Sequence, residues 1–295
     1  MTQVALIVLV TIVFTGAAVR LSASGLGCPD WPKCYDQYVA PAQINAWIEY
    51  GNRLFTGITG IVVIAVSLLA FARRPYRWHL ALFGALLPLG VIGQAVLGAF
   101  VVKYHLPPEL VIGHFILSMI LIDAAFALFW CSRYEVGERR FSSDWFGVWA
   151  VRALIPIGQL TIFLGTMTTA SGPHPGDHDE ELVQRFDFKG ADTLEWMVQR
   201  HATAAVCFAL SVLVVVAILR RRGGDRRAVR PLTATFGLIC LQIAVGITQW
   251  QLELPAVMVW FHVVIATLTW VAVLWSVATA GQLESRARIE SAGAT

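Results

Sequence analysis

The chain has 295 residues, of which 57% are hydrophobic and only 14% are charged, and its mean hydropathy is +0.66. A soluble domain carries about a quarter charged residues, so this composition excludes an ordinary soluble protein and indicates an integral membrane protein. The formal net charge of +3 says little about partners, because its distribution matters more, and no nucleic-acid-binding face is visible, so no nucleic-acid partner is expected.

Eight apolar runs are each long enough to cross a hydrocarbon core roughly 30 Å thick, which takes about 20 helical residues. They lie near 3–20, 49–71, 79–102, 109–131, 148–170, 195–219, 231–250 and 256–280. The first run lacks a basic n-region and a small-residue cleavage site, so we expect a transmembrane helix there and not a signal peptide. The predicted fold class is an all-α integral membrane protein with eight transmembrane helices.

Arginine is concentrated in alternate connections and in the C-terminal tail. Fourteen of the 22 Lys and Arg residues fall on one side of the predicted topology. By the positive-inside rule this side and both termini are cytoplasmic, in a multi-pass protein of the cell membrane. These residues are Arg73, Arg74, Arg77, Arg133, Arg139, Arg140, Arg220, Arg221, Arg222, Arg226, Arg227, Arg230, Arg286 and Arg288. The opposite, outer face then carries two long loops, 21–48 and 171–194.

A helical hairpin occurs twice, at a constant sequence offset of 148. The matching positions are Gln94 and Gln242, Gly98 and Gly246, Leu106-Pro107 and Leu254-Pro255, and His114 and His262. Such a repeat indicates a duplicated unit. We therefore expect two pseudo-symmetric four-helix bundles, 1–147 and 148–295, a build that can hold a planar cofactor between facing side chains.

The outer loop 21–48 contains a close cysteine pair, Cys28 and Cys34. In an oxidising compartment a disulfide is the default interpretation, and a structural role is favoured over a redox role. A metal site is the alternative, although two thiols without a nearby histidine are a poor ligand set. No Cys-x-x-Cys-His motif is present, so covalent haem attachment is excluded.

In the second half, His201 and His262 are expected on antiparallel helices at one depth. Two neutral imidazoles facing each other across a bundle suit the two axial positions of a haem iron. The alternative is that each is a core histidine bonded to a neighbouring hydroxyl. Their shared depth within a duplicated frame favours haem ligation.

In the first half, His114 has no histidine partner. The matching position on the second helix is Asn52, or Arg53 under the strict offset of 148, and neither is an ordinary iron ligand. Glu49 lies on the same helix face as Asn52 and Arg53. It either forms a structural ion pair with Arg53 or places a proton-carrying carboxylate beside an iron centre.

The other polar residues near the helix ends have weaker signals. Four cations could bind haem propionates or snorkel to the interface: Arg20, Arg53, Arg200 and Lys103. Asp123 is nine residues past His114, hence on the opposite face, and is expected to pair with another helix. Four histidines are expected to be solvated, with His105 and His174 as reserve ligands: His79, His105, His174 and His178.

Several motifs together resemble the haem A synthase family over essentially the whole chain. They are Gly25-Leu-Gly-Cys-Pro-Asp-Trp-Pro-Lys-Cys34, Glu49-x-x-Asn52-Arg53, Leu106-Pro-Pro…His114, Gly172-Pro-His-Pro-Gly-Asp177, His201 and Leu254-Pro…His262. The cysteine motif and the Gly-Pro-His-x-Gly-Asp loop are the specific ones, and the histidine spacings add to them.

Members of that family are eight-helix membrane enzymes that oxidise the C8 methyl group of haem O to the formyl group of haem A for terminal oxidases. The resemblance implies a non-covalent haem b on His201 and His262 that relays electrons. It also implies that the first half holds the substrate haem O, with His114 as ligand and Glu49 as catalytic carboxylate, and that Cys28 and Cys34 form a disulfide. Candidate partners are haem O synthase (a farnesyltransferase), an electron donor and a second copy of the chain within the lipid bilayer.

One position departs from the family pattern, because Asn52 stands where a histidine is usual. The substrate iron is then five-coordinate on His114, or another group substitutes, or the mechanism differs. We favour five-coordination, since an open position would let oxygen or water reach the iron. The competing functions are a di-haem electron-transfer cytochrome and a non-catalytic haem carrier. One histidine pair and one unpaired histidine fit a cofactor and a substrate better than two permanent haems.

Overall fold

The computed structural model describes residues 1–135, 139–177, 179, 183–222 and 226–285. The helices of the first half are α1 (Thr2–Leu21), α2 (Ile44–Ala72), α3 (Trp78–Lys103) and α4 (Pro108–Ser132). Those of the second half are α5 (Trp145–Arg152), α6 (Leu154–Ser171), the 3-10 turn η1 (Gly190–Asp192), α7 (Thr193–Arg221), α8 (Arg226–Gln251) and α9 (Ala256–Gly281). Two short strands, β1 (Arg139–Phe141) and β2 (Gln282–Ser285), pair antiparallel.

Eight segments of the described chain are long and apolar enough to cross a membrane, with α5 and α6 forming one of them together. This confirms the prediction of an eight-span helical membrane protein. The break between α5 and α6 at Ala153 was not predicted. Its physical cause is Pro156, which has no N–H to donate and whose ring clashes with the carbonyl of Arg152, four residues earlier.

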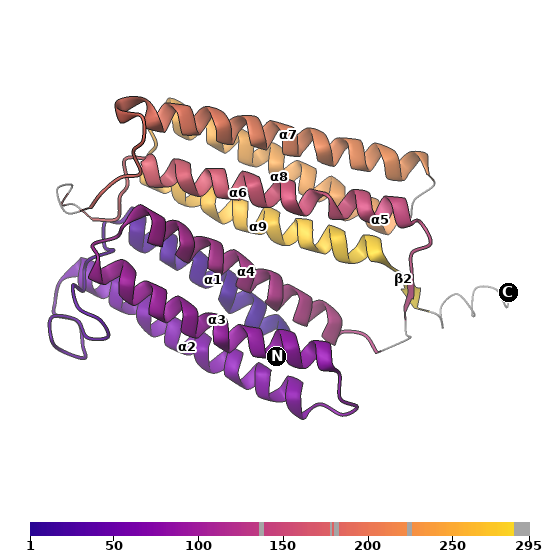
Figure 1. Cartoon of the computed structure of the whole chain (residues 1–295), viewed down its shortest axis with the longest axis horizontal. Helices are drawn as coiled ribbons and strands as arrows, with labels where there is room; N and C mark the ends of the chain where they lie inside the picture. Colours follow the sequence, from indigo (N-terminus) through magenta and orange to yellow (C-terminus); the bar gives the residue numbers. More distant parts are fainter. Residues whose placement is uncertain (136–138, 178, 180–182, 223–225, 286–295) are drawn as a thin grey trace.

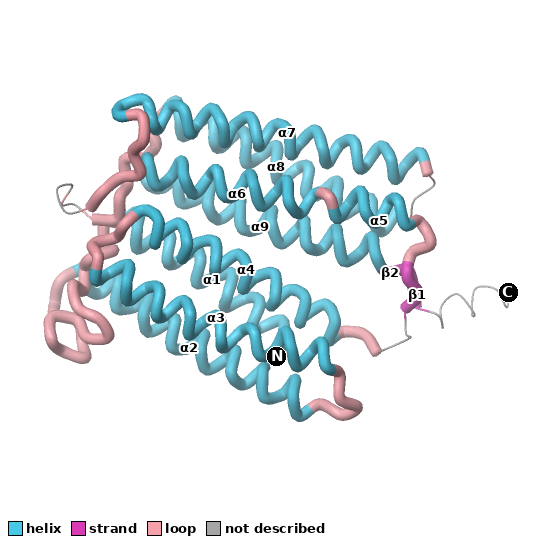
Figure 2. Tube along the Cα trace, in the orientation of Figure 1, coloured by secondary structure: helices cyan, strands magenta, loops and turns pink. Residues whose placement is uncertain are grey.

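The helices run side by side along the long axis of the molecule in two groups, α1–α4 and α5–α9 (Figure 1). Within each group, helices that follow one another in sequence pack together, and α1 and α4 contact α9 across the boundary. The connections lie at the two ends of the molecule (Figure 2). We call the end that carries residues 22–43, 172–177 and 183–192 the disulfide end. A separate haem site in each group is not tested by this arrangement and stays a prediction.

Two tryptophans of α9 fasten the groups to each other. Trp260 Nε1 donates to the carbonyl oxygen of Phe14 on α1 at 2.9 Å. Trp270 Nε1 donates to Asp123 Oδ1 on α4 at 2.6 Å, so Asp123 does pair with another helix as predicted. One continuous hydrophobic core includes Trp270 and Ile122 and therefore spans the boundary. Because side-chain packing and hydrogen bonds hold helices together inside a bilayer, these contacts define one assembly.

Helix bounds reveal the internal repeat directly. α3 and α8 have the same length, and they begin at positions 78 and 226, which is the offset of 148 seen in the hairpins. α2 and α7 also match each other in length, but they begin at positions 44 and 193, which is an offset of 149. The offset changes by one because the connection 73–77 is one residue longer than the connection 222–225. Positions on α2 therefore match positions on α7 at an offset of 149.

The two hairpin turns share an unusual backbone. His105 and Leu106 have φ of +59° and +58°, and their counterparts Glu253 and Leu254 have +60° and +60°. A non-glycine residue in this left-handed region costs about 1–2 kcal/mol, so two in succession are rarely adopted without a structural reason. Each turn closes with the same backbone hydrogen bond, from Leu106 to Val101 and from Leu254 to Gln249. The second helix of each hairpin then starts with the same geometry.

A glutamine fixes the register of the two helices in each hairpin. Gln94 Nε2 donates to the carbonyl oxygen of His114 at 3.0 Å, and Gln242 Nε2 donates to that of His262 at 2.9 Å. Both bonds connect residues twenty apart along the chain. A buried side-chain amide that finds such a partner keeps neighbouring helices from sliding past one another. Each histidine is thereby held about 9 Å inside its helix, at about 1.5 Å per residue.

Candidate haem sites

The second-half site brings together His201 of α7 and His262 of α9, as the sequence predicts. Their ring centres are 6.1 Å apart and their planes are inclined by 66°. An imidazole nitrogen binds a transition metal at about 2 Å, so two imidazoles on opposite sides of one metal have ring centres about 6 Å apart. The spacing fits two axial ligands of one iron.

The hydrogen bonds of these rings also fit metal ligation. His201 Nδ1 lies 3.0 Å from the carbonyl oxygen of Thr161 on α6, so this nitrogen carries the proton and Nε2 keeps its lone pair. His262 Nδ1 is buried and has no hydrogen-bond partner among the described residues. Burying a ring nitrogen without a hydrogen-bond partner costs free energy. A haem bound between the two rings would change the atoms that surround this nitrogen. The donor set fits the predicted non-covalent haem b site, which stays a prediction.

A glycine on the neighbouring helix lies against each histidine ring. A Cβ built on Gly165 would be 2.9 Å from His201 Cε1, and one on Gly246 would be 3.2 Å from His262 Cε1. In the first half, a Cβ on Gly98 would be 3.5 Å from His114 Cε1. Because distances near 3 Å are too short for carbon atoms, the absent side chains at Gly165 and Gly246 are what admit the rings. The role of Gly165 was missed in the sequence, where it is one small residue among many.

The first-half site has a different composition. The His114 Nδ1 atom is buried without a hydrogen-bond partner among the described residues, like that of His262. At the offset of 149, the residue that matches His201 is Asn52, not Arg53. Asn52 Oδ1 lies 2.7 Å from Thr15 Oγ1, which lies 3.2 Å from the carbonyl oxygen of Ile12 on α1. Thr15 carried no recognisable signal in the sequence.

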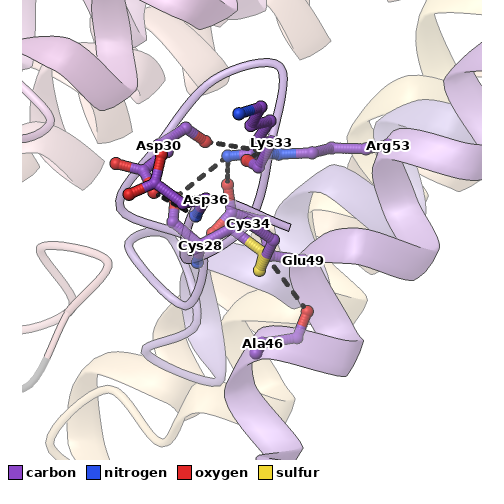
Figure 3. Close-up of a disulfide and its surroundings, with 8 residues drawn as sticks. All are labelled: Cys28, Asp30, Lys33, Cys34, Asp36, Ala46, Glu49 and Arg53. Atoms are coloured by element: carbon purple, nitrogen blue, oxygen red, sulfur yellow. Dashed lines mark hydrogen bonds and ion pairs between the residues drawn. A yellow bond between two sulfur atoms is a disulfide. The ribbon is translucent and has the colours of Figure 1, made fainter. Parts of the chain in front are cut away.

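Arg53 points away from the bundle and into the disulfide loop (Figure 3). Its Nη1 donates to the carbonyl oxygens of Asp30 and Lys33 at 2.8 and 2.9 Å. Its Nη2 donates to the carbonyl oxygen of Cys28 at 3.0 Å and to Glu49 Oε1 at 2.5 Å. With four acceptors already bound, Arg53 organises the loop. A contact between Arg53 and a haem stays a prediction.

Glu49 is buried, with 5% of its surface exposed, and both of its carboxylate oxygens are bound. Oε1 pairs with Arg53 and Oε2 accepts from the backbone N–H of Cys28 at 2.7 Å. The structural ion pair that the sequence left open is therefore present, while the catalytic role of Glu49 stays a prediction. The sequence placed the start of this helix at Glu49, but α2 begins at Ile44. The extra turn forms because Ala46 packs under the cysteines.

The disulfide between Cys28 and Cys34 is present, and both cysteines are buried. Cys28 Sγ also lies 3.7 Å from the carbonyl oxygen of Ala46, so the crosslink rests directly on the first turn of α2 (Figure 3). This confirms the predicted pairing. Its position next to Glu49 and Arg53 indicates that the loop and the start of α2 form one structural unit.

His174 is not solvated, which corrects the expectation from sequence. Its Nε2 donates to the carbonyl oxygen of Leu254 at 2.8 Å, because the loop after α6 folds over the α8–α9 turn and supplies the donor that this carbonyl needs. Arg20 reaches the same loop, with Nε and Nη2 donating to the carbonyl oxygens of His174 and Thr169 at 2.9 and 3.0 Å. Arg20 is thus part of the boundary between the two groups of helices.

The remaining candidates are exposed or contact residues other than the site histidines. Arg200 is exposed, with its guanidinium 4.6 Å from the ring centre of Trp196, and Lys103 lies over Tyr104 at 5.7 Å. His105 is exposed, as expected, and His79 is half-buried next to Arg77. His178 lies outside the described residues. Propionate binding by any of these cations stays a prediction.

Comparison with known families gives a match over most of the chain. The family model described as cytochrome oxidase assembly protein matches residues 1–47 and 39–274. Those ranges include both hairpins and every residue of the two histidine sites.

Individual relatives carry the name heme A synthase. The protein of Shewanella oneidensis is 28% identical over 180 residues, which is 55% of this chain and 52% of that protein. The protein of Exiguobacterium sp. is 25% identical over 80% of this chain and 77% of its own length. That of Listeria welshimeri is 29% identical over 81% of this chain and 79% of its own length. In the Shewanella alignment this chain spans about half of the relative. The resemblance drawn from the motifs is confirmed, and the chain belongs to the cytochrome oxidase assembly protein family.

Proposed function

We propose that this protein is a haem A synthase, an oxidoreductase that converts the C8 methyl group of haem O to the formyl group of haem A. The observation that carries the proposal is the difference between two matching sites. One has a histidine pair whose ring centres lie 6.1 Å apart, and the other has His114 alone, with Asn52 at the position that matches His201. This asymmetry suits one resident cofactor and one substrate.

In the second half, His201 and His262 would hold a non-covalent haem b. When bound, haem b supplies one-electron transfer between a donor and the substrate site. The protein's contribution is to fix the ligands. The Thr161 carbonyl orients the His201 ring, Gly165 and Gly246 give the two rings room, and Gln242 sets the helix register. Such supporting contacts determine how strongly a metal centre is held.

In the first half, His114 would bind the iron of haem O, and Glu49 would accept a proton released near the disulfide end. Each Glu49 oxygen accepts one hydrogen bond, and because each carboxylate oxygen has two lone pairs, a proton can bind without either bond opening. The bond from the uncharged Cys28 N–H is the weaker of the two, because the Arg53 bond joins two ionised groups and adds the attraction between their charges. Glu49 would therefore act through Oε2.

The orientation belongs to the proposal as well. The end opposite the disulfide end carries Arg73, Arg77, Arg152, Arg220 and Arg222 among the described residues. The positive-inside rule makes that end cytoplasmic in a cell membrane and puts both histidine sites near the outer surface. Haem O synthase, an electron donor and a second copy of the chain are the partners that this function calls for.

The test is chemical analysis of the haem after incubation. Purified protein in detergent is supplied with haem O, a reductant and air, and the extracted haem is identified by mass. A haem A synthase returns haem A, whereas a carrier returns haem O unchanged. A di-haem electron-transfer cytochrome retains two haem b groups and neither takes up nor alters haem O. Either of the last two results contradicts the proposal.

A further inference from the structure

Asn52, at the position that matches His201, differs from its counterpart in both shape and chemistry. Asn52 matches His201 at the offset of 149 between α2 and α7, and Ile12 and Gly16 of α1 likewise stand 149 residues before Thr161 and Gly165 of α6. In the second half, His201 donates directly to the Thr161 carbonyl. In the first half, Asn52 reaches the matching Ile12 carbonyl only through the hydroxyl group of Thr15. Both residues thus connect to a backbone carbonyl of the neighbouring helix, His201 directly and the shorter Asn52 through a bridging hydroxyl group.

The shorter side chain leaves space. A Cβ on Gly165 would be 2.9 Å from the His201 ring, whereas a Cβ on Gly16 would meet no described atom within 4 Å. Asn52 has no imidazole ring to fill the space that His201 fills in the second half, and its side chain is only partly buried. Polar space of this kind, with hydrogen-bonding groups on its wall, accommodates a molecule the size of water.

The hydrogen bonds around Asn52 leave a donor unused. The single hydroxyl proton of Thr15 cannot serve both the Ile12 carbonyl and Asn52 Oδ1. Turning the amide so that Nδ2 donates to Thr15 satisfies both contacts, and which way an amide points follows from such a network. In either orientation at least one Asn52 N–H has no acceptor among the described residues. An amide N–H is a hydrogen-bond donor and has no lone pair to offer iron, so this group is free to donate to another molecule.

We infer that Asn52 and Thr15 form a pocket for an uncharged diatomic gas molecule such as dioxygen, bound opposite His114 and held by a hydrogen bond from Asn52. The inference rests on the proposed function, because it requires a haem in the first half. Thr15 is a positioning residue, which fixes the Asn52 amide and does not touch the gas. In haem proteins, donors and open space on the side away from the protein ligand decide whether such molecules bind.

Carbon monoxide is the probe. The full-length protein is loaded with haem O in addition to its resident haem, the haem content per chain is counted, and the reduced protein is titrated with carbon monoxide. We expect two haems per chain and one carbon monoxide per chain, with the oxidised protein showing one high-spin and one low-spin haem. The His201–His262 site, with both axial positions filled, binds no gas.

Two variants locate the gas. Asn52→His installs the residue of the matching site, with room for the ring next to Gly16, and should abolish carbon monoxide binding while both haems remain. Thr15→Val should retain one carbon monoxide per chain but shift its C–O stretching frequency, because Asn52 loses its anchor. A purely structural role for Thr15 would leave that frequency unchanged.

The outcomes separate the two proposals. Two haems per chain without carbon monoxide binding in the unmodified protein overturn the pocket and leave the proposed function standing. This result needs no variant, so misfolding of Asn52→His cannot obscure it. A chain that binds only the haem lost in His262→Ala has no first-half haem site and overturns both proposals. Undiminished carbon monoxide binding by folded Asn52→His also overturns the pocket.

Discussion

The two halves of the molecule share a backbone frame and differ in the side chains mounted on it. α2 and α7 have the same length, and the hairpin turns repeat the same left-handed pair. Yet Glu49, Asn52 and Arg53 on α2 are matched by Val198, His201 and Ala202 on α7. The frame is kept by turn geometry and by the two glutamine bonds, which do not involve the residues that differ. The shared fold therefore determines where a site lies, whereas the side chains at that site determine what chemistry it can perform.

The largest expected effect separates the halves by removing one histidine. His262→Ala should lose the low-spin haem b signal completely, because His201 alone cannot fill both axial positions. The matched variant in the other half, His114→Ala, should retain that signal. The absorption spectrum and haem content of purified protein measure both. A low-spin signal that survives in His262→Ala would mean that the ligands have been misassigned.

The next effect concerns a group that only the first half has. Glu49→Gln keeps the shape and the Cys28 contact but removes the proton acceptor, so turnover of haem O should fall at least about 100-fold while haem b stays bound. The rate of haem A formation, normalised to haem b content, is the measurement. Full turnover in Glu49→Gln would leave Glu49 with its structural role alone.

Arg53→Ala tests how the first half is held together. The guanidinium binds Glu49 and three loop carbonyls, and breaking a buried ion pair costs about 3–5 kcal/mol because a charge is left without its partner. Thermal unfolding in detergent should show a clearly lower Tm. Arg200→Ala is the control, since this exposed cation lies over Trp196 and contributes about 0.5–1 kcal/mol. Equal losses in the two variants would show that the loop does not depend on Arg53.

The smallest effect compares two matching glycines. Gly165→Ala should displace the His201 ring and weaken haem b retention by about 1–3 kcal/mol, the usual cost of overpacking. Gly16→Ala should leave haem b retention unchanged, because its added methyl group lies in the other half and meets no described atom within 4 Å. Loss of haem b during dialysis against a haem-binding protein reports the difference. Equal retention in both variants would contradict the close contact at Gly165.

Much of the fold follows from hydropathy alone. The expected run 256–280 and the observed α9 agree to within one residue, because lipid-facing helices need a long apolar stretch and little else. The start of α2 could not be predicted in this way. Residues 44–48 mix apolar and polar side chains, and they are helical because Ala46 packs under a disulfide that is distant in sequence.

The sequence was enough to predict the histidines of the candidate sites, but not the residues that surround and orient them. His201 and His262 stand out because ionisable residues inside membrane helices are rare. The choice between Asn52 and Arg53 required the lengths of two connections, which only the helix ends reveal. Thr161 and Gly165 act on His201 from another helix, through a carbonyl group and an absent side chain. Neither leaves a recognisable pattern.

The contacts between the halves have a consequence for electron flow. Gly25 donates its backbone N–H to the carbonyl oxygen of Gly176 at 2.8 Å at the disulfide end, and Trp260 and Trp270 bind Phe14 and Asp123 further along the helices. Three attachments at different depths leave the halves no hinge about which to swing. With a haem in each half, as proposed, the tunnelling distance between them would be a constant of the architecture, and the rate of electron transfer would be governed by driving force and not by domain motion.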